Sequence, residues 1–199
     1  MSAAPVRKRV AVLISGRGSN MQSLVHAAAA ADYPAEIVGV FSNRADAGGL
    51  AFAAEHGIPT AVRSHRDFNT RADFDAEIEA VLEGWGAEIV CLAGFMRILS
   101  EGFVERWRGR MLNIHPSLLP AFKGLDPHGQ ALAAGVTEHG CTVHWVIPAL
   151  DDGPAILAAR VPVLPDDTAD TLAARVLVEE HKLYPEALAR VARGEAWLD

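Results

Sequence analysis

The sequence has no excess of basic residues, no long apolar segment and only two cysteines. Lys and Arg number 18 against 25 Asp and Glu, which gives a net charge of −7. Broad binding to nucleic acid needs a basic surface, so this balance argues against it. The first apolar run covers only Val10 to Ile14 and is too short for a signal peptide core or a membrane span. Cys91 and Cys141 both lie in apolar runs, which favours a reduced, cytoplasmic protein.

Repeats, low-complexity segments and linkers are also lacking. The composition, 50% hydrophobic and 22% charged, is typical of a folded globular protein. A chain of 199 residues is long enough for one sizeable core. We therefore expect a single domain over residues 1–199, with residues 1–8 as a flexible tail.

Short apolar runs alternate with helical patterns through the first half of the chain. These runs lack the apolar–polar alternation of a half-exposed strand, so they predict a parallel sheet covered by helices on both faces. We predict strands at 10–14, 37–41, 60–63, 87–93 and 111–115, and helices at 20–32, 46–56 and 71–83.

The second half of the chain has a different pattern. Two longer strand patterns, 140–147 and 155–163, flank the turn-rich segment PALDDGP, which favours antiparallel pairing. A short helix is expected near 128–134 and a final helix at 170–192, which Pro185 should kink or divide. The fold class predicted is α/β: a single doubly wound, mostly parallel, Rossmann-like sheet with a late antiparallel pair and a C-terminal helix.

The glycine-rich turn SGRGSN, at 15–20, stands between the first strand and the first helix. The N–H groups of Gly18, Ser19 and Asn20 would point outward at a positive helix end, where α/β folds bind anions. Met21 replaces the third glycine of a dinucleotide fingerprint, and no Gly-Lys-Ser/Thr follows, so a single phosphate is favoured. The alternative is an ordinary turn with Ser19 as the N-cap.

Three polar residues reach the edge where parallel sheets collect functional groups: Asn113 and His115 on the strand pattern 111–115, and Asp151 in the turn between the two late strands. An Asn donates a hydrogen bond to a developing oxyanion, a His moves protons and an Asp holds the His. These residue types suit acyl transfer. Their alternatives are a surface or core role for His115 and a turn-forming role for Asp151.

No residue has the pattern of a nucleophile. Ser117 lacks a Gly-x-Ser-x-Gly elbow, so direct attack of one substrate on the other fits better than a covalent intermediate. The histidines lack metal-ligand spacing, which makes zinc improbable. His144 could be structural or line the site. The run 95–99 could be core, but its interruption by Arg97 suits a flat ring in a groove.

Several motifs occur together in the order and spacing that they have in one known family. They are GRGSN at 16–20, LAGFMRIL at 92–99, NIHPSLLP at 113–120, LDDGP at 150–154 and EEHKLYP at 179–185. Across essentially the whole chain the sequence resembles the folate-dependent phosphoribosylglycinamide formyltransferases. The resemblance implies transfer of a formyl group from 10-formyltetrahydrofolate to the amine of glycinamide ribonucleotide (GAR) in purine synthesis, without a metal.

The same resemblance implies roles for individual residues. The catalytic residues are Asn113, His115 and Asp151. Residues that bind GAR are Gly18, Ser19, Asn20, Gly94, Pro116 and Glu180. Residues that bind folate are Arg71, Met96, Arg97, Ile98, Leu99, Asn113, Ile147, Pro148, Ala149, Leu150 and Asp151. The chain departs from the family at Gly129, where relatives often carry Arg, and at Asp152, where many carry Gly.

Three alternative functions would require features that differ from those of this sequence. Methionyl-tRNA formyltransferases carry a further C-terminal domain and need a basic surface, which this acidic chain lacks. Formyltetrahydrofolate hydrolases add an N-terminal regulatory domain, and their loop usually lacks the Pro-Ser-Leu-Leu-Pro run. A non-catalytic nucleotide-binding module would leave the Asn, His and Asp unexplained. We therefore expect small-molecule partners, no nucleic acid, no membrane, and a monomer or homodimer.

Overall fold

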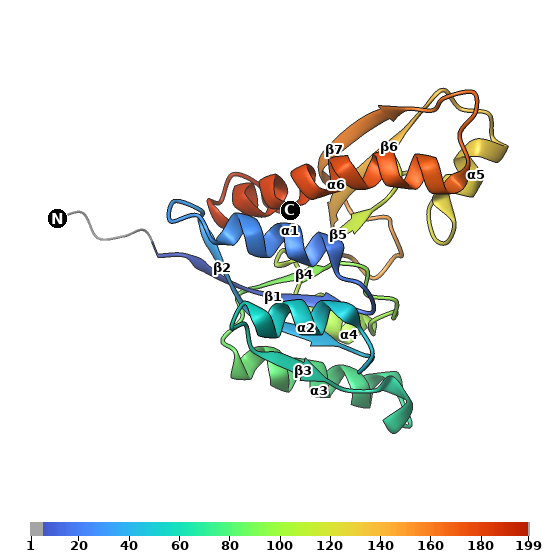
Figure 1. Cartoon of the computed structure of the whole chain (residues 1–199). Coiled ribbons are helices and arrows are strands. Elements are labelled where there is room, and N and C mark those ends of the chain that lie inside the picture. Colours follow the sequence, from blue (N-terminus) through green and yellow to red (C-terminus); the bar gives the residue numbers. More distant parts are fainter. Residues whose placement is uncertain (1–5, 199) are drawn as a thin grey trace.

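A seven-stranded sheet organises the chain, in the order β3-β2-β1-β4-β5-β6-β7 (Figure 1). The computed structural model describes residues 6–198. The strands are β1 (Lys8–Ile14), β2 (Ala35–Ser42), β3 (Thr60–Val62), β4 (Ile89–Leu92), β5 (Met111–His115), β6 (Glu138–Trp145) and β7 (Ala155–Pro162). Neighbours from β3 to β5 pair parallel, whereas β6 pairs antiparallel with both β5 and β7. The α/β fold predicted from the sequence is confirmed.

Six α-helices accompany the sheet: α1 (Ser19–Ala28), α2 (Gly48–Glu55), α3 (Arg71–Gly84), α4 (Glu101–Arg106), α5 (Pro127–Ala133) and α6 (Ala169–Ala192). A short 3₁₀ turn covers His65–Asp67. Of the tail expected at 1–8, residues 1–5 lie outside the described part, and Lys8 already belongs to β1. None of the helices within residues 6–198 is both long and apolar enough to cross a membrane.

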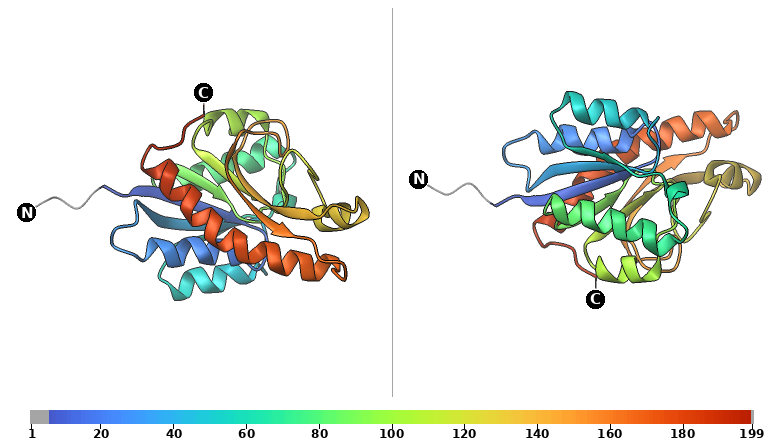
Figure 2. Two further views of the ribbon diagram at one scale, coloured as in Figure 1. Left: turned by 90° about the horizontal axis from the view of Figure 1, so that it is seen from above. Right: turned by 90° about the horizontal axis from the view of Figure 1, so that it is seen from below.

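Helices cover both faces of the sheet, as Figure 2 shows with α6 in front from above and α3 in front from below. One core cluster joins α1, α2 and α6 to the sheet, a second joins α3 and α4 to the opposite face, and a third joins α5 and α6 to β6 and β7. Within β1, Val10, Val12 and Ile14 face the first cluster, whereas Ala11 and Leu13 face the second. Both sides of β1 are therefore apolar, which explains the absence of alternation in its sequence.

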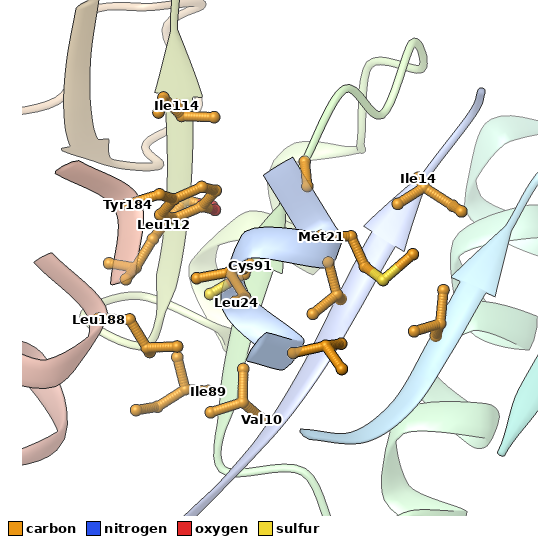
Figure 3. Packing of buried hydrophobic residues seen from close by; sticks show 14 of the residues in the cluster. Val10, Ile14, Met21, Leu24, Ile89, Cys91, Leu112, Ile114, Tyr184 and Leu188 are labelled. Carbon is orange, nitrogen blue, oxygen red and sulfur yellow. The ribbon is translucent and has the colours of Figure 1, made fainter. Parts of the chain in front are cut away.

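Helix α6 continues through Pro185 without a break, so the predicted division of the last helix is wrong. Tyr184, fully buried beside this proline, places its hydroxyl 2.9 Å from the Leu92 carbonyl and 3.2 Å from the Leu112 carbonyl. Figure 3 shows Tyr184 and Leu188 packed beside Leu112 in the first core cluster. Packing against β4 and β5 stabilises the helix despite the hydrogen bond that proline cannot make.

The strand order reverses direction at β1. Strands β2 and β3 lie on one side of β1, and strands β4 and β5 on the other. In open α/β sheets the crevice at such a switch point, outside the carboxyl ends of the strands, is where ligands bind. The segments that follow β1, β4 and β5 therefore frame the candidate site.

Candidate active site

Asn113 and His115 lie on β5, and Asp151 lies in the turn that joins β6 to β7. The His115 Nδ1 is 3.5 Å from the Asp151 Oδ2, and both side chains are buried, with exposed fractions of 7% and 8%. The His115 Nε2 lies 2.9 Å from the Phe122 carbonyl oxygen. This contact orients the ring, and a protonated His115 would donate to both neighbours.

His144 is a fourth member of the cluster. It pairs with Asn113 across the antiparallel register of β5 and β6. The Asn113 Nδ2 lies 3.2 Å from the His144 Nε2, and the His144 Nδ1 lies 2.9 Å from the Trp145 carbonyl oxygen. Burial lowers the pKa of His144, which favours a neutral ring that donates from Nδ1 and accepts the Asn113 amide at Nε2. The sequence did not decide whether His144 is structural or lines the site; in the structure His144 lines the candidate site.

Two loops meet at Asp151. The Gly124 N–H donates to the Asp151 Oδ2 at 3.0 Å, and Lys123 forms an ion pair with Asp152. The charge that Asp152 adds beside the predicted catalytic carboxylate is therefore compensated by a lysine of the facing loop. Asp151 itself has a φ of 48°, in the left-handed region that L-residues adopt at a cost.

The glycine-rich turn forms the N-terminus of α1 and lines a cleft of about 810 Å³. Gly18, with φ 73°, is the N-cap, and Ser19 is the first helical residue, so the interpretation of Ser19 as N-cap is wrong. A Cβ on Gly18 would lie 3.1 Å from the Gly49 Cα, so both the angle and the close approach of α2 require glycine. The N–H groups of this turn remain free of a side-chain cap.

Asn20 and Glu180 are 160 positions apart, yet the Asn20 Nδ2 donates to the Glu180 Oε2 at 2.6 Å. Burial raises the pKa of the Glu180 carboxyl, and the hydrogen bond from Asn20 opposes that rise. The Asn20 Oδ1 is buried and has no hydrogen-bond partner within the described residues. Two of the predicted GAR-binding side chains are thus in direct contact.

A second, smaller pocket of about 70 Å³ lies beside Asn113. Its lining includes most of the residues predicted to bind folate, namely Arg97, Ile98, Leu99, Asn113, Ile147, Pro148, Ala149, Leu150 and Asp151. Met96, also predicted to bind folate, lines the larger cleft, as does Gly94, which was predicted to bind GAR. Arg97 lines both cavities. Arg71 is exposed at the start of α3 and lines neither, and Pro116 follows His115 without lining either cavity.

A family profile described as formyl transferase matches residues 8–188. The chain belongs to this family. It is 45% identical to the phosphoribosylglycinamide formyltransferase of Escherichia coli K12, over 96% of this chain and 93% of that one. A structure of glycinamide ribonucleotide transformylase 1 from Symbiobacterium toebii is 42% identical with a TM-score of 0.94, covering 97% of this chain and 91% of that chain. The resemblance recognised in the sequence motifs is confirmed.

A longer protein also matches this chain. The trifunctional purine biosynthetic protein adenosine-3 of Bos taurus is 53% identical over 97% of the chain, but the match covers 19% of that protein. The chain therefore spans about a fifth of the length of this relative.

Two features of this candidate site were not foreseen from the sequence. The Ser15 hydroxyl donates to the Asn43 Oδ1 at 2.5 Å and accepts the Met96 N–H at 2.8 Å, which joins the segments after β1, β2 and β4. Ser117 donates to the Ala121 carbonyl at 2.6 Å, so this hydroxyl holds a loop rather than facing a base. Within residues 6–198, no group of three or more His, Cys, Asp or Glu side chains is arranged to hold a metal ion.

Proposed function

We propose that this formyl transferase moves the formyl group of 10-formyltetrahydrofolate to the amine of N1-(5-phospho-D-ribosyl)glycinamide (GAR), in purine synthesis. The observation that carries the proposal is that Asn113 and Asp151 line the small apolar pocket, that His115 contacts Asp151, and that the larger cleft of the glycine loop adjoins this pocket at Arg97. The name of the Escherichia coli relative supports phosphoribosylglycinamide as the formyl acceptor, and that of the Bos taurus relative supports a role in purine synthesis.

In the proposed arrangement, the phosphate of GAR lies on the N–H groups of Gly18, Ser19 and Asn20. Glu180, held by Asn20, accepts hydrogen bonds from the ribose hydroxyls. The folate ring enters the pocket between 97–99 and 147–151, whose mouth exposes Ile98 and Leu150 to solvent. A flat ring would cover this apolar surface, which favours its binding.

The amine of GAR attacks the formyl carbon, and a tetrahedral oxyanion forms. The Asn113 amide and a protonated His115 stabilise this oxyanion, and losing one such donor typically costs about 2.7–4 kcal/mol. Since the His115 Nε2 lies against the Phe122 carbonyl in the free protein, donation to the oxyanion requires this contact to open when substrates bind. Hydrogen bonds of this kind often adjust in the substrate complex.

Collapse of the intermediate breaks the bond between the formyl carbon and the folate N10. The attacking nitrogen loses a proton and the departing N10 gains one, and the Asp151 carboxylate relays it. The amine attacks directly, so no covalent bond to the protein is needed. The hydrogen bond of Ser117 to Ala121 agrees with this route, because it leaves no activated serine beside the cluster.

The test mixes the purified protein with GAR and 10-formyltetrahydrofolate and follows the deformylated folate spectroscopically. The expected result is folate release that depends on GAR and yields one formylated ribonucleotide per folate. Absence of an amine-dependent signal would overturn the proposal. Consumption of the formyl donor without GAR would instead indicate a hydrolase. His115→Ala, measured alongside, identifies signal from contaminating enzymes.

A further inference from the structure

The large cleft extends beyond the glycine loop, away from Asn113 and His115. Part of it is lined by residues 43–46, which follow β2, and 64–66, which follow β3. Neighbouring strands lie about 4.8 Å apart, so the ends of β2 and β3 lie roughly 5 and 10 Å from the end of β1. A substrate that reaches from the glycine loop on β1 to the catalytic side chains on β5 spans the other half, because β5 lies on the opposite side of β1.

The lining of the cleft is positively charged although the chain carries a net charge of −7, and two of its arginines, Arg44 and Arg66, belong to this outer part. Four arginines line the whole cleft, Arg17, Arg44, Arg66 and Arg97, against the single carboxylate of Asp46. A cleft lined by one sign of charge concentrates ligands of the other sign. The proposed function assigns a phosphate to the glycine loop and the folate ring to the pocket at Arg97, so the charges over β2 and β3 have no ligand group assigned to them.

The segment after β2 holds its arginine in a defined position. The Asp46 carboxylate accepts two hydrogen bonds from Arg44, at 2.9 and 2.7 Å. The Arg44 N–H also donates to the Ser42 hydroxyl at 3.1 Å, and buried Asn43 is fixed by Ser15. The guanidinium is therefore presented by an ordered turn, and its remaining N–H groups stay available for an anion.

The segment after β3 is ordered in the same way. The Ser64 hydroxyl accepts the Arg66 N–H at 3.2 Å and caps the short 3₁₀ turn. His65, between them, has its pKa lowered first by burial and then by the positive charges of Arg97 and Arg66. The ordered turn and the lowered pKa of His65 both agree with a preformed cationic wall, formed by Arg44 and Arg66, on this side of the cleft.

We propose that this wall binds a second phosphate group. The protein would then take a competing ligand in which a sugar ring carries two phosphates, one on the glycine loop and one between Arg44 and Arg66. Doubly wound folds that bind nucleotides use the same layout, with an arginine near the end of the second strand against a ribose phosphate. The inference rests on the glycine loop as a phosphate site, and the ligand would exclude GAR by occupying that loop.

Calorimetry with two matched nucleotides tests the inference. Adenosine 5′-monophosphate offers one phosphate, and adenosine 2′,5′-bisphosphate offers a second one across the ribose. The wild-type protein at low ionic strength is expected to bind the bisphosphate about tenfold or more tightly than the monophosphate. In the double variant Arg44→Gln/Arg66→Gln this gain is expected to fall below about threefold.

Arg160→Gln is the matched control, because Arg160 is an exposed arginine of β7 paired with Glu138 and outside the cleft. It should keep the full gain. Equal affinity for the two nucleotides, binding of neither, or a gain that survives in the double variant would each overturn the inference. No formyl donor enters this measurement. A protein that transfers formyl groups without the gain refutes only the second subsite, and one with the gain but no transfer refutes only the proposed function.

Discussion

At the scale of single residues, Asp151 is the most constrained side chain of the site. One carboxylate oxygen accepts the Gly124 N–H and faces His115, and the other lies 3.8 Å from His144. Its backbone is one of three non-glycine positions with positive φ among the described residues, the others being Phe122 and Asp126. All three belong to the two loops at the site. Strained backbone of this kind costs about 1–3 kcal/mol per residue and persists where surrounding contacts hold it.

Asp151→Asn is expected to lower the turnover of formyl transfer by about tenfold or more, equivalent to about 1.4 kcal/mol. The amide keeps the size of the carboxylate and an acceptor for Gly124, but it has no charge to pair with His115. Turnover measured with both substrates saturating checks this. The control is Asp166→Asn, an exposed carboxyl remote from both cavities. A smaller loss in a fully folded variant would contradict the role of Asp151 as proton relay.

Glu180→Gln is expected to raise the free energy of unfolding at pH 7. Burial raises the pKa of Glu180, so the folded state disfavours its charged form. The stability linked to this raised pKa is complete below about 4.5 and is lost as pH rises through the folded value, so wild type is weaker at neutral pH. Gln removes the charge and still accepts the hydrogen bond from Asn20.

Urea denaturation of wild type and Glu180→Gln at pH 7 and at pH 4.5 measures this difference. The advantage of the variant should shrink in acid, because at pH 4.5 Glu180 is about half protonated in the unfolded state and more fully protonated in the folded state. Glu179→Gln, which removes the carboxylate of the half-buried neighbour that pairs with Lys182, is the matched control. A variant less stable than wild type at pH 7 would show that the charge is stabilised by its surroundings.

At the scale of elements, local patterns predicted the buried strands well because β1 and β4 are apolar on both faces. The local patterns failed where tertiary packing or the length of an element decides its structure. Six residues are too few for α4 to show a helical period, and packing keeps α6 whole through Pro185. The N-cap is Gly18 and not Ser19, because α2 approaches closely at Gly49. This approach is not visible in the sequence, so the local pattern could not predict it.

The site was predictable in part for similar reasons. Asn113 and His115 lie on a strand pattern and Asp151 lies in a turn between two others, and the ends of strands meet at one edge of the sheet. The contact of Asn113 with His144 depends on the antiparallel register of β5 and β6, which no local pattern specifies. Contacts between chain segments far apart, such as that of Asn20 with Glu180, lie equally beyond periodicity.

The two loops that hold Asp151 are joined by the ion pair of Lys123 and Asp152. Lys123 stands between Phe122, whose carbonyl contacts His115, and Gly124, whose N–H holds Asp151. Asp152→Gly, the residue that the family resemblance leads us to expect here, should lower kcat/KM by up to about fivefold, since exposed ion pairs contribute about 0–1 kcal/mol. The loss should appear in kcat, because the loops position catalytic groups.

Salt distinguishes this electrostatic effect from a general loss of structure. The difference between wild type and Asp152→Gly is expected to narrow as sodium chloride rises toward 1 M, where exposed charges are screened. Lys182→Met, which breaks a comparable pair with Glu179 on α6, should leave kcat/KM unchanged at every salt concentration. A ratio between wild type and Asp152→Gly that is constant with salt would contradict the role of the pair.

At the scale of the whole molecule, buried polar groups are unevenly distributed. Most of them lie at or beside the carboxyl ends of β1, β2 and β5 and along β6. Asp75 is an exception, and it accepts the Ser100 N–H at 2.6 Å where α3 packs near α4. The apolar cores on the two faces therefore stabilise the sheet, and the polar groups at its edge serve the site at a cost in desolvation.

Buried and half-buried histidines make the stability of the protein depend on pH within one range. Burial is the first cause of a lowered pKa at five of them: His65, His128, His139, His144 and His181. The unfolded chain takes up protons at these rings near pH 6.5, whereas the folded protein resists until lower pH. The unfolded state thus binds more protons below about 6.5, and the free energy of unfolding falls as pH drops through that window. The raised pKa of Glu180 acts in the opposite direction, as one group against five.

Urea midpoints at pH 7.5 and pH 5.5 are therefore expected to show a clear loss of stability in acid. His139→Gln should reduce the difference between the two midpoints, because His139 is fully buried and faces His128 at 3.2 Å, so its protonation places a charge beside a second histidine. His56→Gln, an exposed histidine, should leave the difference as in wild type. Equal midpoints at the two pH values would mean that the folded protein accommodates these charges, and that the buried edge of the sheet is more hydrated than its packing indicates.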